Sequence, residues 1–171
     1  MEMLYAPWRE EYTTDTAHGP KGQETADASQ CVFCTQFKAH KDDDYMILAR
    51  YTHSYIMMNK YPYNSGHLLV LPIAHKANLD ELPTEARTEL MELITHSTSI
   101  LKKELNAHGM NVGLNLGKAA GAGMPSHLHF HVLPRWNGDT NFLPTLANTK
   151  QISTDLVKLF FQLKPHFQNL I

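Results

Sequence analysis

The chain has little cysteine and no long hydrophobic run, and each shortage excludes a class of protein. Only two of its 171 residues are cysteines, Cys31 and Cys34, which is too few for the disulfide framework of a small secreted domain. No apolar stretch approaches the roughly 20 residues that a transmembrane helix needs. Residues 1–12 are charged and aromatic and lack the apolar centre of a signal peptide. We therefore expect a cytoplasmic protein with no membrane partner.

An excess of positive charge is lacking as well. The formal net charge is −2, so we expect no basic surface for nucleic acid. What the chain does have is an ordinary hydrophobic share of 43% over 171 residues, which is enough to build one core. We therefore expect a single domain over residues 1–171. Residues 13–30, rich in Thr, Gly, Asp and Ala, have no periodicity and are predicted to be a mobile connector.

The hydrophobic pattern predicts an α+β fold. Alternating apolar residues and turn signals predict five strands, at 45–50, 54–59, 67–72, 111–116 and 127–134. An apolar stripe at helical spacing predicts a long helix over 84–107, which Gly109 would stop, and a second stripe predicts a helix over about 152–163. Because strands outnumber crossover helices, we expect an antiparallel meander with helices on one face.

Three histidines stand at strict alternation with large apolar residues. The segment reads His127-Leu-His129-Phe-His131-Val, and in an extended chain the three imidazoles would share one face. A single histidine on a strand is usually a hydrogen-bonded polar residue, but three at period two favour chemistry. Imidazole titrates near neutral pH, which suits nucleophilic, acid–base or metal roles.

A glycine-rich loop precedes this segment. Gly117, Gly121 and Gly123 would let the backbone approach a ligand and present N–H groups to an anion. Such loops are more often simple turns. Its place directly before the histidines favours an anion site next to a nucleophile.

The two cysteines form a Cys-x-x-Cys pair, Cys31-Val-Phe-Cys34, which is half of a tetrahedral zinc site. The missing half would have to be histidine, since no other cysteine exists. A redox pair or two unconnected thiols remain alternatives.

In combination these motifs resemble those of the histidine-triad (HIT) family. The segment 127–135 resembles its histidine signature, and 58–70, with Asn59 and Gly66-His67, resembles its nucleotide-binding hairpin. The segment 111–121 resembles its phosphate loop. Residues 134–142 resemble a bacterial branch that acts on diadenosine tetraphosphate. The likeness covers roughly 31–145, leaving 1–30 as an extension and 146–171 as a C-terminal helix and tail.

The resemblance implies roles for individual residues. It makes His129 the nucleophile that attacks the α-phosphorus and becomes nucleotidylated, with His131 beside the phosphate and His67 in the same polar network. Asn59 would bind ribose hydroxyls. The phosphate-contacting positions that it implies are Asn115, Gly121, Ala122 and Gly123. Lys118 and Ser126 are candidates for assisting the leaving group.

The resemblance also implies a metal and an assembly. Many bacterial members carry structural zinc, and the matching ligands here are Cys31, Cys34, His75 and His127. The family further implies a homodimer with one continuous sheet and the helix 84–107 at its centre. Three aromatic residues that we expect to be exposed would support an interface: Trp136, Phe160 and Phe161.

The sequence leaves four candidate functions to be compared. The first is a nucleotidyl hydrolase or transferase that cleaves dinucleoside polyphosphates, with water or phosphate as acceptor. The second is an adenosine 5'-monophosphoramidase, and the third is a nucleotide-binding protein without turnover. The fourth ignores the resemblance and makes His127, His129 and His131 a catalytic metal site, but no nearby carboxylate completes it.

Overall fold

The structure is a computed structural model that describes residues 27–149, 151–152 and 154–171. Of the predicted N-terminal extension, residues 1–26 lie outside the described residues. Residues 28–30 form a short 3₁₀ turn, η2 (Ala28–Gln30), which the side chain of Asp27 caps by accepting from the N–H of Ser29. This turn leads directly into α2 (Val32–Lys38), a helix that the sequence pattern did not reveal.

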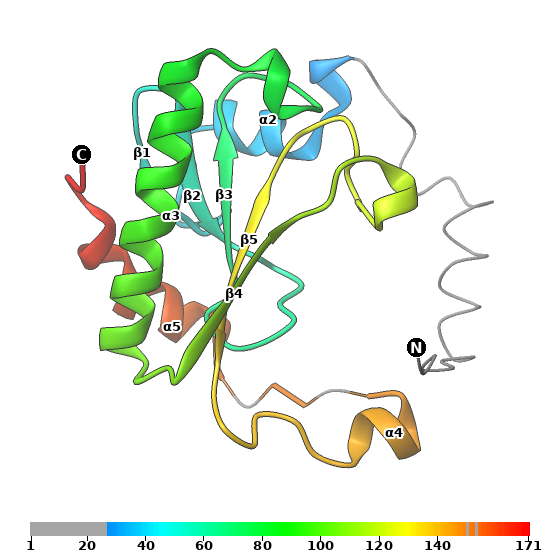
Figure 1. Ribbon diagram of the computed structural model, residues 1–171. Coiled ribbons are helices and arrows are strands. Elements are labelled where there is room, and N and C mark those ends of the chain that lie inside the picture. Colours follow the sequence, from blue (N-terminus) through cyan, green and yellow to red (C-terminus); the bar gives the residue numbers. More distant parts are fainter. Residues whose placement is uncertain (1–26, 150, 153) are drawn as a thin grey trace.

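Five antiparallel strands form one sheet (Figure 1), which confirms the predicted α+β class. They are β1 (Ile47–Arg50), β2 (Ser54–Met58), β3 (Leu68–Pro72), β4 (Gly109–Leu114) and β5 (Phe130–Arg135). The order β1-β2-β3-β5-β4 departs from a simple meander, because β5 lies between β3 and β4. The last two strands therefore carry the histidine segment into the middle of the sheet and leave β4 at an edge.

Helices cover both faces of the sheet rather than the single face expected. The long helix α3 (Thr84–Glu104) packs on one face through a buried stripe, and its core neighbours include Ile56, Val70 and Val132. On the other face, Phe33 and Phe37 of α2 pack against a second cluster: Ile47, Tyr55, Met57, Leu69 and Leu71. The fully buried strands β2 and β3 lie between these two layers.

The helix boundaries differ from the predicted ones for identifiable reasons. Helix α3 ends at Glu104 instead of 107, because Asn106 takes a left-handed conformation (φ 49°), and Gly109 begins β4 instead of stopping the helix. Helix α5 (Leu156–Leu163) begins four residues later than predicted, where Asp155 caps it by accepting from two backbone N–H groups. Phe160 is 1% exposed and packs in the core, so the expectation that it is exposed was wrong.

Four short elements complete the described part of the chain. A 3₁₀ turn, η3 (Leu79–Glu81), precedes α3, and η4 (Lys118–Ala120) lies in the loop between β4 and β5. Helix α4 (Leu143–Ala147) projects from the body beyond the end of β5 (Figure 1), and η5 (Lys164–Phe167) closes the chain against β1. Within the part of the chain that the structure describes, no helix is both long and apolar enough to cross a membrane.

Candidate active site and metal centre

Along the histidine segment 127–132, core residues still alternate with histidines, although only the part from Phe130 onward belongs to a strand. Leu128 and Val132 are buried in the core, while His127 and His129 precede β5 and His131 lies within it. The predicted strand over 127–134 is therefore shorter at its start. The ladder between β3 and β5 stops at Val70–Phe130, and Pro72 has no N–H with which to extend it.

His67, the residue before β3, joins the triad from the neighbouring strand. Its Nε2 atom lies 2.9 Å from Nδ1 of His131, and the rings of His129 and His131 lie 5.0 Å apart. The turn that delivers His67 depends on Gly66, whose φ of 74° favours glycine, and a Cβ there would lie 2.6 Å from Leu105. The structure thus brings three of the predicted catalytic residues together.

A backbone donor fixes where the protons of His67 and His131 reside. The N–H of Tyr63 donates to Nδ1 of His67 (3.1 Å), so in a neutral ring the proton of His67 is on Nε2. That Nε2–H then donates to Nδ1 of His131, which places the proton of His131 on Nε2. The Nε2 atom of His131 is buried and has no partner among the described residues. It is a donor available to a substrate oxygen.

A backbone acceptor fixes the opposite arrangement at His129. The Nδ1 atom of His129 lies 2.8 Å from the carbonyl oxygen of His127, and a carbonyl can only accept. Nδ1 of His129 therefore carries the proton and Nε2 carries a lone pair. The site consequently pairs a nucleophilic nitrogen on His129 with a neighbouring N–H donor on His131.

Burial keeps these imidazoles neutral. Burial, with smaller contributions from the neighbouring His131 and His129, lowers the pKa of His67 to about 3. Burial likewise lowers the pKa of His131 to about 4, with a contribution from His129, and lowers the pKa of His129. At neutral pH the rings are uncharged, which is the state that a nucleophilic imidazole requires.

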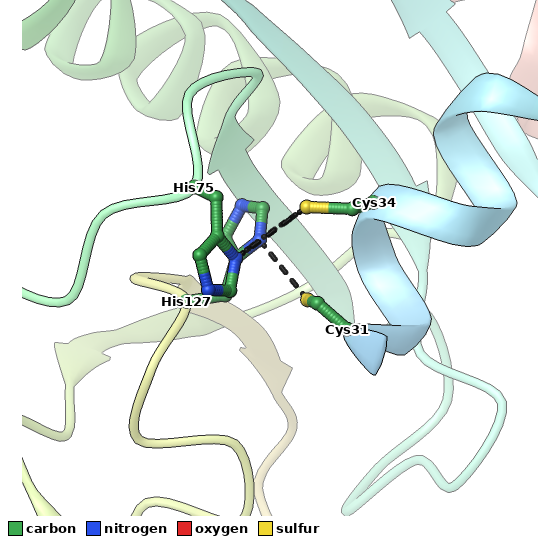
Figure 2. Close-up of side chains that lie close together, drawn as sticks. All are labelled: Cys31, Cys34, His75 and His127. Atoms are coloured by element: carbon green, nitrogen blue, oxygen red, sulfur yellow. Dashed lines mark hydrogen bonds between the residues drawn. The ribbon is translucent and has the colours of Figure 1, made fainter. Parts of the chain in front are cut away.

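The predicted zinc ligands converge beside the triad. Cys31 and Cys34 lie at the start of α2, His75 follows β3, and His127 begins the histidine segment, so three chain segments meet at one point (Figure 2). The ligand atoms of all four residues lie within 4.8 Å of one another. The Nδ1 atom of His127 is 3.3–3.4 Å from Sγ of Cys31, Sγ of Cys34 and Nδ1 of His75.

The separations of 3.3–3.4 Å from Nδ1 of His127 to the other three ligand atoms fit a tetrahedral zinc ion. Bonds of about 2.3 Å to sulfur and about 2.0–2.1 Å to nitrogen place neighbouring ligand atoms roughly 3.3–3.8 Å apart. The tautomer of His127 also suits metal binding. Its Nε2 lies 2.9 Å from the carbonyl oxygen of Pro72 and so carries the proton, which leaves a lone pair on Nδ1 for the metal. Burial, with Cys31 close by, raises the pKa of the Cys34 thiol to about 11. A cation would supply the charge that a buried thiolate needs.

Asn59 lies within the histidine network. Its Nδ2 atom is 3.3 Å from Nδ1 of His67, and its Oδ1 accepts from the N–H of Tyr61. The amide of Asn59 thus orients the hairpin and lies at the edge of the site, where a second N–H and a second lone pair remain for a ligand.

The glycine-rich loop bonds mainly to itself. The N–H groups of Ala120, Gly121 and Ala122 donate to carbonyls of Gly117 and Lys118. Asn115 is half-buried, whereas Gly121 and Gly123 are exposed. Of the two candidates for assisting the leaving group, Lys118 is exposed, and Ser126 donates to the sulfur of Met124. The structure does not bring the loop's predicted donors into contact with the histidines.

Two aromatic residues next to the site were missed by sequence reasoning. Phe33, between the cysteines, packs against His127 and His129, with ring centroids 5.6 and 5.3 Å away. Tyr63 of the hairpin packs against His67 and His131. The sequence offers no spacing signal for the contacts of Phe33 with His127 and His129 or of Tyr63 with His131, because these residues are distant along the chain.

A buried carboxylate holds the hairpin to the end of β5. Asp139 accepts from Arg135, from the side chain of Asn64 and from the N–H of Trp136, and these bonds hold its pKa well below the usual range. Asn64 also donates to the carbonyl of Pro134, and its own carbonyl accepts from the N–H of His67. Asn64 therefore joins the turn before His67 both to the end of β5 and to the backbone of His67.

Comparison with known proteins places this geometry in context. Residues 41–138 match the family described as "HIT domain". The chain is 35% identical over 152 residues to the AP-4-A phosphorylase of Mycobacterium tuberculosis, covering 89% of this chain and 77% of that protein. It is 32% identical over 111 residues to the adenosine 5'-monophosphoramidase HNT1 of Saccharomyces cerevisiae, covering 65% of each.

A solved structure shares the fold. It is a Zn-bound histidine triad family protein from Mycobacterium smegmatis, with a TM-score of 0.67 and 24% identity, covering 84% of this chain and 97% of that one. Its fold matches the sheet and helices described above.

Proposed function

The chain belongs to the HIT domain family, and on that premise we propose that it cleaves dinucleoside polyphosphates such as diadenosine tetraphosphate at an α-phosphate. It is a nucleotide hydrolase or phosphorylase, in keeping with its relative AP-4-A phosphorylase. The observation that carries the proposal is the 2.8 Å contact between Nδ1 of His129 and the carbonyl of His127, because it leaves Nε2 as the nucleophile.

The proposed reaction has two displacements. Nε2 of His129 attacks the α-phosphorus, so a P–N bond forms while the P–O bond to the remaining polyphosphate breaks and its electron pair leaves with that oxygen. The Nε2–H of His131 donates a hydrogen bond to the charged oxygens, as donors fixed in advance stabilise such charge. In the second displacement an acceptor oxygen attacks the same phosphorus and breaks the P–N bond. Water loses a proton to solvent in that step, whereas phosphate leaves joined to the nucleotide.

We assign the remaining predicted site residues to substrate binding. Asn59, at the edge of the histidine network, would bind ribose hydroxyls. The segment with Asn115, Gly121, Ala122 and Gly123 would approach the phosphates. The loop would have to exchange its internal hydrogen bonds for bonds to phosphate, so we expect it to rearrange when nucleotide binds.

The metal is proposed as structural zinc on Cys31, Cys34, His75 and His127. When bound, it would cross-link α2, the segment after β3 and the histidine segment, with no position left open for catalysis. The thiolate ligands suit a reducing compartment, so the cytoplasm is the location that we propose.

A homodimer is proposed as well. The edge strand β4 exposes Asn111, Val112 and Gly113, and Met91 is exposed on α3. Pairing of two β4 strands would continue the sheet across both subunits and bring α3 to the centre of the contact.

An adenosine 5'-monophosphoramidase activity is the second candidate, favoured by the HNT1 relative. Product analysis separates the two. The protein would be given diadenosine tetraphosphate with and without inorganic phosphate, and separately an adenosine phosphoramidate. We expect ATP plus AMP from hydrolysis or ATP plus ADP from phosphorolysis, with His129→Ala protein as the control. Turnover of the phosphoramidate alone would replace the first candidate by the second, and two ADP would contradict attack at the α-phosphorus.

A further inference from the structure

Tyr63 contacts both His67 and His131, the two histidines joined by the hydrogen bond from Nε2 of His67 to Nδ1 of His131, which we call the donor pair. Its ring lies 5.8 Å from that of His131 with the planes 21° apart, and 4.8 Å from that of His67 at 42°. Its backbone N–H donates to Nδ1 of His67. One residue of the hairpin loop therefore holds the donor pair by its ring and by its main chain.

The ring determines how freely His131 can turn. One hydrogen bond from His67 holds the Nδ1 atom of His131. Such a bond alone does not stop the imidazole from turning about the bond that joins it to its Cβ atom. An aromatic ring nearly parallel to the imidazole restricts that rotation through offset stacking. The ring of His129 also packs against this imidazole, with the planes 68° apart, so the rings of both Tyr63 and His129 contact His131.

We propose that Tyr63 is a positioning residue for the reaction proposed above: its N–H and its ring together keep the Nε2–H of His131 as the fixed donor to the phosphoryl group. Tyr63 acts through His131 and need not touch the reacting atoms. The idea rests on the proposed function for its effect on rate, but its effect on proton position is a property of the protein without substrate.

The experiment compares three variants. Tyr63→Phe keeps the ring, and Tyr63→Ala removes it. Tyr61→Ala is the matched control, because Tyr61 lies two residues earlier in the same loop and is 78% exposed. Two-bond ¹H–¹⁵N correlation spectra of the imidazoles report which nitrogen of His67 and His131 carries the proton. Turnover of diadenosine tetraphosphate gives kcat and KM, and thermal melting checks folding.

We expect Tyr63→Phe and Tyr61→Ala to match the wild type in both readouts. Without the ring, His131 can turn away from Nε2 of His67 and lose the hydrogen bond that fixes its tautomer, so Tyr63→Ala should average the two ¹⁵N resonances of His131. It should also lower kcat about tenfold, with KM within about twofold, since a loosened donor weakens binding of the transition state and not of the substrate. Unchanged ¹⁵N resonances in Tyr63→Ala would overturn the proposal, even if KM rose. If the wild type showed no turnover of any nucleotide, the proposed function would fail, while the spectra would still decide the role of Tyr63.

Discussion

The carbonyl of His127 accepts a hydrogen bond from the ring of His129, so the first histidine of the triad orients the second. A main-chain atom makes this contact, so the contact does not use the side chain of His127 directly. The orientation of the proposed nucleophile thus depends on the path of the backbone before β5, and its proposed chemistry depends on the imidazole of His129.

Replacement of that imidazole should abolish the reaction. His129→Ala removes the attacking nitrogen, so we expect kcat to fall by at least about 10³-fold with an unchanged melting temperature. Rapid-quench experiments with labelled substrate should trap a nucleotidyl-protein in the wild type only. A variant that retains more than about a tenth of the wild-type kcat would exclude His129 as nucleophile. His129→Asn should still bind AMP, because the amide occupies similar space.

Loss of a zinc ligand should affect stability before activity. Cys34→Ser and His75→Ala should lower the zinc content, which we expect near one per chain, and reduce Tm by at least about 5 °C. Elemental analysis and calorimetry measure the two effects, and His96→Ala on α3 is a control with no role at the cluster. Chelation of the wild type should lower Tm more than it lowers kcat at room temperature. Purified protein with far less than one zinc per chain would contradict the ligand set.

Acid should destabilise the protein through the buried histidines. Because burial lowers the pKa of His67 to about 3 and of His131 to about 4, the unfolded chain binds more protons than the folded one below pH 6.5. Stability is therefore fully present above pH 6.5 and is lost as the pH falls toward 4. Urea unfolding at pH 7, 6 and 5 should show a falling free energy of unfolding, and His67→Asn should flatten that dependence. An equal slope in both proteins would remove His67 as its cause.

Nucleotide binding should depend on the ribose more than on the base. Asn59 offers a donor and an acceptor to the hydroxyls, whereas apolar enclosure discriminates between purines weakly. We expect AMP and GMP to bind within about tenfold of each other, a difference of ~1.4 kcal/mol. Dideoxy-AMP should bind far more weakly, and Asn59→Ala should abolish that preference. Equal binding of AMP and dideoxy-AMP by the wild type would end the assigned role of Asn59.

The edge strand β4 offers a test of assembly. Light scattering at micromolar concentration should give a dimer for the wild type. Val112→Lys, at a position that is 46% exposed, should shift it toward the monomer by placing charge in the contact. Val157→Lys on α5, where Val157 is 55% exposed, is the matched control and should stay dimeric. A monomeric wild type would refute the homodimer.

Patterns of local origin were predicted well. The five strands, the stripe of α3 and the alternation around His129 follow from periodicity, which short stretches of chain carry by themselves. Helix α2 was missed because it has only seven residues, and its apolar positions reflect contacts with the sheet and the cysteine pair. The helix ends were misplaced where the left-handed conformation of Asn106 and the N-cap formed by Asp155 outweighed the apolar pattern.

The donor and acceptor arrangement lay beyond prediction. It depends on the main-chain groups of Tyr63, Pro72 and His127, and nothing in the residue types at those positions announces such bonds. The spacing of the cysteines predicted only half of a metal site. The histidine half came from the family resemblance, and the structure then brought the four residues together.

The cluster also bears on how the protein is made. Cys31 and its partner His127 are 96 positions apart, so the ribosome must deliver most of the chain before the contact can form. Contacts at such separation close late in folding, since a long loop must be ordered first. Until then the folded site does not enclose the two thiols, which can react with oxidants or bind metal together with ligands other than His75 and His127. During the interval between synthesis of the cysteines and synthesis of His127, the folded site therefore cannot shield the two thiols.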